Sequence, residues 1–302
     1  MSCAGSTDVR PATTVREVRV AGRVLCVHET GAGDGPAILF HHGTPGPGVA
    51  MPAWTRDADE RGVRLIGYSR PGYAHSTPDP GRTMVEAGSD AAAIMDALGV
   101  ERFLTWGVSG GAPHALACAA VLPDRVAAVA SVAGVAPFRA RGLNYFDGMG
   151  DENLIEFGLA MAGREQLEPF CSAAAEQMLT MGADGLLDAM ASLVSPPDRA
   201  VLTGELAATM AAEMPTVFAS GVQGWIDDDF AFLAPFGFEL SAIACPVLIV
   251  HGRQDRFVPV AHGEWLAREI PGAEAWISAD EGHLTLSARG IPAVHEWLLA
   301  RL

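Results

Sequence analysis

Apolar residues along the chain follow two patterns, one typical of strands and one typical of helices. Near the start, alternating apolar positions flank the turn Ala21-Gly22 and predict an antiparallel hairpin. The alternating positions are Val15, Val18, Val20, Val24, Cys26 and His28. Continuous apolar runs follow, each typical of a strand that is buried on both faces. They cover residues 36–43, 63–69, 103–109, 126–136, 246–252 and 273–278.

Segments with helical spacing separate these runs. They cover residues 90–98, 112–122, 262–270 and 291–298, and each carries small or apolar residues on one face. Alternating buried strands and helices indicate the α/β class, with a doubly wound and mostly parallel sheet.

Residues 138–236 interrupt this alternation, because they contain helical stripes and no convincing strand. The stripes are Leu154, Phe157 and Met161, then Phe170, Met178 and Met181, then Leu202, Leu206 and Met210. We therefore predict a core domain formed by residues 1–137 and 237–302, and a helical cap formed by residues 138–236 and inserted after the sixth strand. Such an insertion is expected over the carboxyl ends of the strands, where folds of this class bind ligands.

Composition places the chain among proteins with a sizeable core, since 49% of its 302 residues are hydrophobic and 19% are charged. The first 14 residues show no secretory signal, and the run 126–136 is too short to span a bilayer. The five cysteines are scattered without a C-x-x-C spacing, which is typical of free thiols in a reducing compartment. We therefore expect a cytoplasmic protein.

Charge narrows the choice of partners. The net charge is −16, from 36 acidic residues against 20 arginines, and the chain has no lysine. This balance argues against nucleic acid and anionic membranes as partners, and the missing lysine excludes Schiff-base chemistry. A small-molecule substrate is expected. Residues 140–240 carry 16 acids and three arginines, which we interpret as a solvated surface of acidic helices.

The sequence GVSGG (107–111) is the one G-x-S-x-G match in the chain, and it lies between an apolar strand and a small-residue helix. A serine on such a sharp turn needs small neighbours, and the turn directs its hydroxyl group and nearby backbone N–H groups toward a substrate. Ser109 is therefore the candidate nucleophile.

A nucleophilic serine requires a base and an acid that orients the base. His283 follows the last predicted strand, so it should face the same side of the sheet as Ser109, whereas His28, His262 and His295 fall within predicted elements and are interpreted as structural. Asp255 follows the strand 246–252 and is the candidate acid. The segment 131–138, where folds of this class can also carry the acid, has no carboxylate.

The sequence HHGTPG (41–46) ends the strand 36–43 and supplies the fourth part of the predicted site. Acyl transfer develops an oxyanion that backbone N–H groups stabilise, and the N–H groups of Thr44 and Gly110 form the predicted pair. His42 and Gly43 are expected to support this loop. No metal and no cofactor are expected.

With these motifs the chain resembles the α/β-hydrolase superfamily, in the branch of esterases, proline iminopeptidases and related capped hydrolases. The resemblance rests on HHGTPG, GYSRPGYAHS (67–76), GVSGG, and HGRQD (251–255) with EGH (281–283), and it extends from about residue 15 to the C-terminus. It implies the triad and oxyanion roles at the positions argued above.

Departures from these relatives narrow the activity. Epoxide hydrolases and haloalkane dehalogenases of this fold carry an aspartate where Ser109 stands. Proline iminopeptidases have another glycine and a tryptophan where this chain has Thr44 and Gly110, which argues against peptidase activity. We expect a carboxylesterase-like serine hydrolase that cleaves an ester, thioester, lactone or similar acyl bond. The alternatives are acyl transfer or cyclisation by the same triad, an iminopeptidase-like aminopeptidase, and a ligand-binding receptor with a vestigial site.

The predicted cap is rich in methionine, with Met149, Met161, Met178, Met181, Met190, Met210 and Met214. Adaptable side chains of this kind suit an apolar substrate, although we interpret most of them as packing between cap helices. Four aromatic residues are candidates for the pocket wall: Phe138, Tyr145, Phe146 and Trp225. The stretch that begins at Trp225 can equally be the hinge back to the core.

Overall fold

The computed structural model describes residues 13–31, 33–182, 185, 188–202 and 204–302. Its centre is a twisted sheet of eight strands in the order β1-β2-β4-β3-β5-β6-β7-β8. β1 pairs antiparallel with β2 and β2 with β4, and every other pairing is parallel. The strands are β1 Thr14–Val20, β2 Arg23–Gly31, β3 Ala37–His41, β4 Arg64–Tyr68, β5 Phe103–Val108, β6 Val126–Val132, β7 Val247–Gly252 and β8 Glu274–Ser278.

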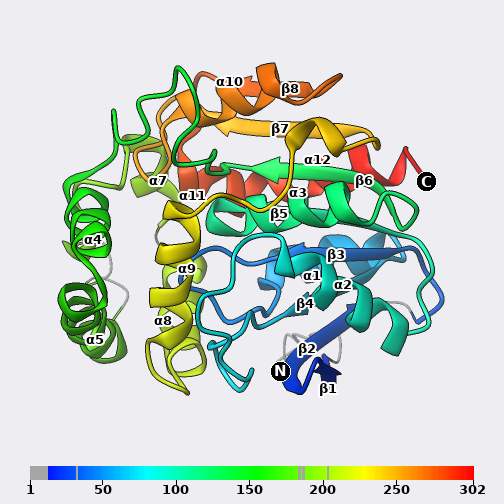
Figure 1. Ribbon diagram of the computed structural model, residues 1–302, viewed down its shortest axis with the longest axis horizontal. Helices are drawn as coiled ribbons and strands as arrows, with labels where there is room; N and C mark the ends of the chain where they lie inside the picture. Colours follow the sequence, from blue (N-terminus) through cyan, green and yellow to red (C-terminus); the bar gives the residue numbers. More distant parts are fainter. Residues whose placement is uncertain (1–12, 32, 183–184, 186–187, 203) are drawn as a thin grey trace, which may run out of the picture.

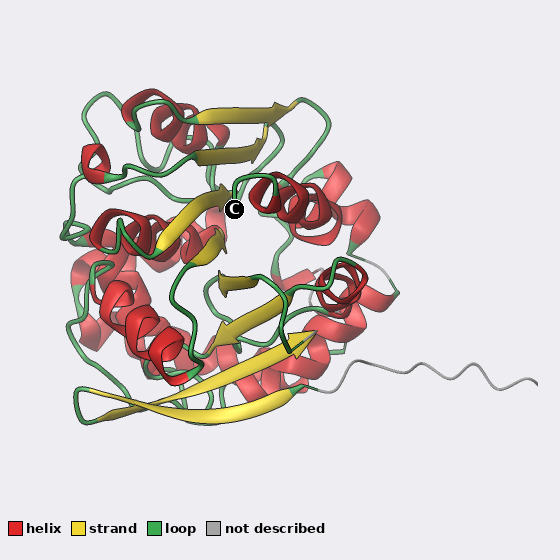
Figure 2. Cartoon of the chain, turned by 90° about the vertical axis from the view of Figure 1, so that its right-hand side faces the viewer, coloured by secondary structure: helices red, strands yellow, loops and turns green. Residues whose placement is uncertain are grey.

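Helices cover both faces of this sheet, as Figure 2 shows from one end of the molecule. The helices of the alternating part are α1 Pro52–Glu60, α2 Glu86–Ala97, α3 Ala112–Val121, α10 Val260–Glu269, α11 His283–Thr285 and α12 Ile291–Leu299. α3 packs on β5 and β6 and α10 on β7, while α1 and α12 contact each other on the opposite face.

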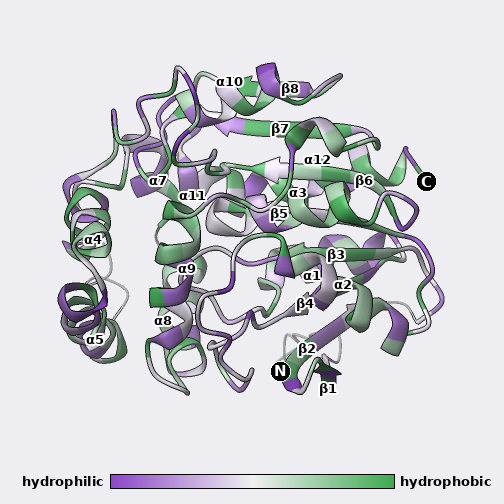
Figure 3. Cartoon of the chain, viewed as in Figure 1, coloured by the Kyte–Doolittle hydropathy of each residue, from purple (hydrophilic) through white to green (hydrophobic). Residues whose placement is uncertain are grey.

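The strands are apolar throughout because both of their faces are covered. In β3, Ile38 and Phe40 belong to one buried cluster and Leu39 belongs to the other. All three side chains are at most 1% exposed. The central strands are accordingly mostly hydrophobic along their length (Figure 3). The predicted fold class is thus confirmed, since both the hairpin and the predicted apolar runs form strands of this sheet.

A helical segment lies between β6 and β7. It contains α4 Asp151–Ala162, α5 Arg164–Thr180, α7 Pro196–Val201, α8 Glu205–Val217 and α9 Gln223–Leu233. Figure 1 shows α4, α5, α8 and α9 standing together beside the ends toward which the β6 and β7 arrows point. These are the carboxyl ends of the parallel strands, where the predicted site residues lie.

Two details of this segment differ from the predicted pattern. The third predicted stripe spans two helices, because Leu202 caps the end of α7 and Leu206 lies in α8. The stretch from Trp225 to Asp229 is buried within α9, and is therefore helix instead of a hinge. Its side chains are buried on several sides, so it carries no one-sided apolar stripe.

The described cysteines, Cys26, Cys118, Cys171 and Cys245, are free thiols, and Cys3 and the first 12 residues lie outside the described part of the chain. Within the described residues, no helix combines the length and the apolar character that crossing a bilayer requires.

Candidate active site

Ser109 lies on a sharp turn between β5 and α3. Its φ of 55° is in the left-handed region, which is unusual for a residue other than glycine and is a mark of strained functional turns. The flanking glycines make the turn possible. A Cβ added at Gly107 would lie 2.2 Å from the carbonyl oxygen of Gly111, and one at Gly111 would lie 2.1 Å from the carbonyl oxygen of His41. The G-x-S-x-G spacing is therefore a steric requirement of this turn.

The loop that follows β3 lies directly against the serine. A Cβ added at Gly43 would be 3.5 Å from the Cβ of Ser109, and one added at Gly110 would be 2.5 Å from Oγ1 of Thr44. Thr44, Ser109 and Gly110 line one small cavity together. The structure thus brings together the two residues of the predicted oxyanion pair, Thr44 and Gly110, at the nucleophile.

His42 hydrogen-bonds both to this loop and to the segment after β4. Its Nδ1 hydrogen-bonds to the carbonyl oxygen of Gly43 at 2.7 Å, and its Nε2 accepts a hydrogen bond from the backbone N–H of Arg70 at 3.1 Å. Burial, followed by the nearby charge of Arg70, lowers the pKa of His42 well below its usual value. A neutral ring donates at one nitrogen and accepts at the other, which agrees with this pair of contacts.

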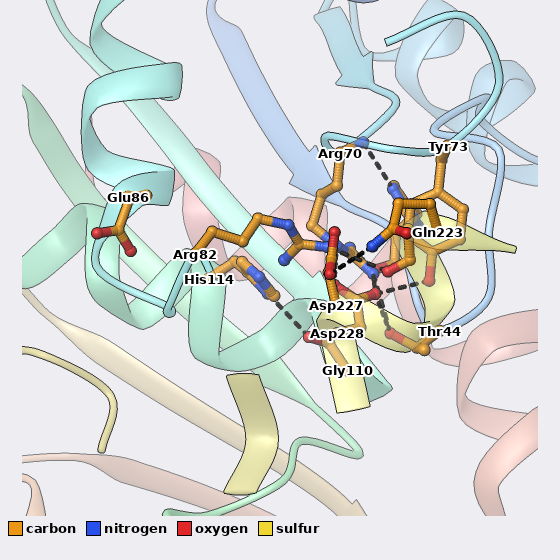
Figure 4. Close-up of polar contacts among 12 residues, drawn as sticks. Thr44, Arg70, Tyr73, Arg82, Glu86, Gly110, His114, Gln223, Asp227 and Asp228 are labelled. Carbon is orange, nitrogen blue, oxygen red and sulfur yellow. Dashed lines mark hydrogen bonds and ion pairs between the residues drawn. The ribbon is translucent and has the colours of Figure 1, made fainter. Parts of the chain in front are cut away.

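A buried ionic cluster hydrogen-bonds to the same loop (Figure 4). Oδ2 of Asp228, in α9, accepts a hydrogen bond from Oγ1 of Thr44 at 2.6 Å and from Nη2 of Arg70 at 2.6 Å. Its Oδ1 accepts one from Nη2 of Arg82 at 2.6 Å. Arg70 also donates to the backbone carbonyl oxygens of His42 and Gly43. The backbone that carries the Thr44 N–H is therefore tied to a helix of the inserted segment.

The charges of this cluster compensate each other. Burial alone raises the pKa of Asp228, but the charges of Arg70 and Arg82 outweigh it and hold that pKa well below its usual range. Arg70 and Asp228 are at most 1% exposed. Sequence reasoning did not select these residues, although Arg70 lies within GYSRPGYAHS and Asp228 within a run of three aspartates.

Asp255 and His283 meet at the ends of β7 and β8. Nδ1 of His283 hydrogen-bonds to Oδ2 of Asp255 at 2.7 Å. Oδ1 of Asp255 accepts the backbone N–H groups of Phe257 and Val258 at 2.9 and 2.8 Å. The carboxylate therefore orders its own loop with one oxygen and the imidazole with the other. Because Nδ1 is the donor, Nε2 of His283 is left as the basic nitrogen.

The electrostatics of this pair favour an ion pair or a strongly polarised hydrogen bond. Burial raises the pKa of Asp255, but the neighbouring charge of His283 and hydrogen bonds from His251 and His283 lower it to about 2. Burial lowers the pKa of His283, but the charge and hydrogen bond of Asp255, together with the charge of Asp198, raise it above 6.5. The ring of Phe257 stacks on His283, with centroids 4.6 Å apart.

Asp198, in α7 of the inserted segment, fixes the backbone of His283. Its Oδ2 accepts the N–H of His283 at 3.0 Å and the hydroxyl group of Ser195 at 2.8 Å. Its Oδ1 accepts the N–H groups of Leu284 and Thr285 at 2.7 and 3.0 Å. The carboxylate is fully buried. Its partners in the catalytic loop, the N–H groups of residues 283–285, lie more than 80 residues away in the sequence, so no local pattern pointed to this contact.

Gly282 makes this approach possible. A Cβ added there would lie 2.3 Å from Oδ2 of Asp198 and 2.4 Å from Oγ of Ser195. A side chain at this position would therefore push the inserted segment away from the loop that carries His283.

Ser109 and His283 line one cavity of about 410 Å³ between the sheet and the inserted helices. Trp225 is on its wall, as are four methionines of the inserted segment: Met178, Met190, Met210 and Met214. The other three predicted wall residues are not among its lining residues. Phe138 lines a separate cavity, and Tyr145 and Phe146 pack in an aromatic cluster with Phe138 and Phe157. These aromatic rings pack on one another, and the spacing of the residues along the sequence does not predict that packing.

The histidines interpreted as structural have partners away from Ser109. Nδ1 of His262 accepts the N–H of Ala136 at 3.1 Å, and Nδ1 of His295 pairs with Asp57 at 2.7 Å. His28 contacts the Cys26 thiol in β2. In the part of the chain that the structure describes, no group of three or more His, Cys, Asp or Glu residues is arranged to hold a metal ion.

The chain is similar to known hydrolases over most of its length. A family model described as alpha/beta hydrolase fold matches residues 36–287. The chain is 26% identical to a 2-hydroxymuconate semialdehyde hydrolase of Pseudomonas putida, over 89% of this chain and 88% of that protein. It is 27% identical to a 2-hydroxy-6-oxononadienedioate/2-hydroxy-6-oxononatrienedioate hydrolase of Klebsiella pneumoniae, over 87% and 86% of the two chains.

The fold is also similar to that of a solved structure. An alpha/beta hydrolase fold protein from Nakamurella multipartita superposes with a TM-score of 0.65 and 26% identity, and the match covers 95% of this chain and 99% of that one.

Proposed function

The chain belongs to the alpha/beta hydrolase fold family, and on that premise we propose that it is a serine hydrolase that cleaves an ester or similar acyl bond of a small molecule through an acyl-Ser109 intermediate. The observation that carries the proposal is the His283–Asp255 hydrogen bond of 2.7 Å at the cavity that also contains Ser109 in its positive-φ turn. A pure binding protein has no need of that combination.

Each group has a role that its contacts support. Nε2 of His283 takes the proton of the Ser109 hydroxyl as its oxygen attacks the substrate carbonyl carbon, and the imidazolium that forms is stabilised by Asp255. The N–H groups of Thr44 and Gly110 stabilise the tetrahedral oxyanion, a contribution of about 3 kcal/mol per donor. His283 then returns the proton to the leaving group, and a water molecule that it activates hydrolyses the acyl-enzyme.

The cavity wall favours a substrate without carboxylate groups. The name of the Klebsiella relative gives a dienedioate substrate, which carries two carboxylates. In the present chain Glu152, Glu156 and Glu213 line the cavity beside Ser109, and no arginine does so among the described residues. Like charges in such a confined site repel, so dicarboxylates should be poor substrates here.

A fluorophosphonate probe and p-nitrophenyl butyrate test the proposal. Wild-type protein should be labelled and should turn over the ester, and Ser109→Ala and His283→Ala should each abolish turnover. Ser89→Ala, at an exposed serine on α2, is the matched control and should leave both readouts unchanged. Folded wild-type protein that resists the probe and shows no esterase activity would refute the acyl-enzyme mechanism.

A further inference from the structure

Three consecutive aspartates of α9 have different surroundings, although all three are at most 2% exposed. Asp227 pairs with Arg164 at 3.0 Å, and Asp228 pairs with Arg70 and Arg82. Oδ2 of Asp227 and Oδ2 of Asp229 are both buried without a hydrogen-bond partner, but among the described residues no ion pair joins Asp229 to an arginine. Most buried carboxylates are paired, so the oxygen of Asp229 requires an explanation.

Asp229 lines the small cavity of about 70 Å³ that also contains Ser109, Thr44 and Gly110. Glu156, from α4, lines the same cavity and the larger one, and its carboxyl group hydrogen-bonds that of Asp229. Oε1 of Glu156 also accepts a hydrogen bond from Nε1 of Trp225 at 2.5 Å. The unpartnered oxygen therefore belongs to a carboxyl pair on the wall beside the nucleophile.

The pKa values of both carboxyl groups are raised. Burial, followed by the charge of Glu156, raises the pKa of Asp229 well above its usual range, and burial also raises that of Glu156. Ionising two adjacent carboxyl groups together is unfavourable unless a cation lies between them. The basic groups that line the cavities do not supply that cation, since His42 is neutral and His283 pairs with Asp255.

Further carboxyl groups extend the acidic wall into the larger cavity. Glu213, from α8, lines it, and burial raises the pKa of Glu213 to about 7. Glu152 lines it as well and is bonded to Ser192. The rest of the small cavity includes three phenylalanine rings, Phe157, Phe232 and Phe257. A compact cation that is taken out of water gains from aromatic faces as well as from carboxylates.

We propose that Asp229 and Glu156 form a subsite for a primary ammonium group, so that the substrate is an acyl compound that carries an alkylammonium chain. The proposal rests on the proposed function, because Ser109 is the group beside which the chain would lie. The ammonium offers three N–H donors, and Oδ2 of Asp229 is an acceptor without a partner. A carboxylate ligand would be repelled, and a neutral alkyl chain would leave this oxygen unsatisfied.

The acidic character of the inserted segment was interpreted from sequence as a solvated surface. The structure corrects that interpretation for Asp198, Asp227 and Asp228, which are buried. It also corrects it for Asp229 and Glu156, which line the small cavity beside Ser109. The reason is that α4 and α9 pack against each other and present these side chains to the shared cavity.

Binding of three simple ligands to the full-length Ser109→Ala protein tests the subsite without any catalytic step. Hexylammonium, hexanol and hexanoate have similar length and differ in charge. We expect calorimetry to show that hexylammonium binds about tenfold or more tightly than hexanol and that hexanoate does not bind. In the same background, Asp229→Asn and Glu156→Gln should weaken hexylammonium by about tenfold and leave hexanol unchanged. Glu168→Gln, at an exposed acid of α5, is the matched control.

Two results would overturn the subsite. One is equal affinity for hexylammonium and hexanol in the Ser109→Ala protein, a comparison that stands even if the cap variants fail to fold. The other is an equal loss of both ligands in Asp229→Asn and Glu156→Gln. The proposed function has a separate readout, since turnover of p-nitrophenyl butyrate by the wild type depends on Ser109 and not on ammonium binding.

Discussion

Replacing Asp198 with asparagine should impair catalysis by His283 while the His283 side chain itself is unchanged. Oδ1 and Oδ2 of Asp198 each accept two hydrogen bonds, and those to Oδ2 come from the N–H of His283 and the hydroxyl group of Ser195. Asparagine retains one acceptor oxygen. Its amide nitrogen would face the donors that one carboxylate oxygen now accepts, so two buried hydrogen bonds are lost.

The number and position of the lost hydrogen bonds set the expected size of both effects. Each hydrogen bond to a buried charged group contributes roughly 1.5 kcal/mol or more, so the free energy of unfolding should fall by about 3 kcal/mol. The backbone at His283 to Thr285 loses hydrogen bonds to residue 198, and a misplacement of about 1 Å at a reacting group costs roughly a hundredfold in rate. We therefore expect kcat to fall by about 10- to 100-fold, with a smaller change in KM.

The pH profile separates this positioning role from a general loss of stability. The charge of Asp198 contributes to the raised pKa of His283, so removing it should move the acidic midpoint of kcat/KM to lower pH. Urea unfolding and the pH dependence of p-nitrophenyl butyrate hydrolysis measure the two effects. Ser195→Ala, which removes one hydrogen bond and no charge, is the control and should leave the midpoint in place. A folded Asp198→Asn protein with wild-type kcat and midpoint would refute the reasoning.

Three further predictions follow from the site. Because neutral His283 is the active base and its pKa is raised, wild-type kcat/KM should rise with pH through a midpoint above 6.5; a midpoint below that value would contradict the ion pair with Asp255. Gly110→Ala would place a Cβ 2.5 Å from Oγ1 of Thr44 and 2.6 Å from the ring of Phe232. We expect kcat to fall by about a hundredfold with the circular dichroism spectrum unchanged, and a variant with wild-type kcat would contradict the tight fit. Asp228→Asn leaves two buried arginines without their counter-ion, so thermal or urea unfolding should show a loss of about 3–5 kcal/mol in the free energy of unfolding. Asp227→Asn, whose partner Arg164 is 39% exposed, should lose far less, and equal losses in the two variants would count against the cluster.

The local pattern of apolar residues was sufficient to predict the strands of the sheet. The apolar runs and the hairpin form the strands of the sheet, because strand and helix periodicities are local properties of the chain. The region between β6 and β7 was harder to predict. Its helices pack on several sides, so α9 lacks a one-sided stripe and the pattern around Leu202 crosses a turn.

Some residues of the candidate site could be predicted from the sequence and others could not. Ser109, Asp255 and His283 could be selected from sequence because each follows a predicted strand, and the carboxyl ends of parallel strands meet at one edge. The aromatic wall could not be selected in this way. Phe138, Tyr145 and Phe146 have the right composition for a pocket, but they pack on one another instead of on the cavity that contains Ser109.

By itself the sequence determined the order of strands and helices and the chemical groups at their ends, because these depend on neighbours a few positions apart. Only the tertiary structure decided which charges are matched. Asp228 is enclosed by Arg70 and Arg82, Asp198 holds a backbone 85 residues further along the chain, and Asp229 has an oxygen without a partner beside the cavity. Pairing of buried charges depends on which distant segments meet in space, and the three adjacent aspartates of α9 cannot be told apart until those segments are in place.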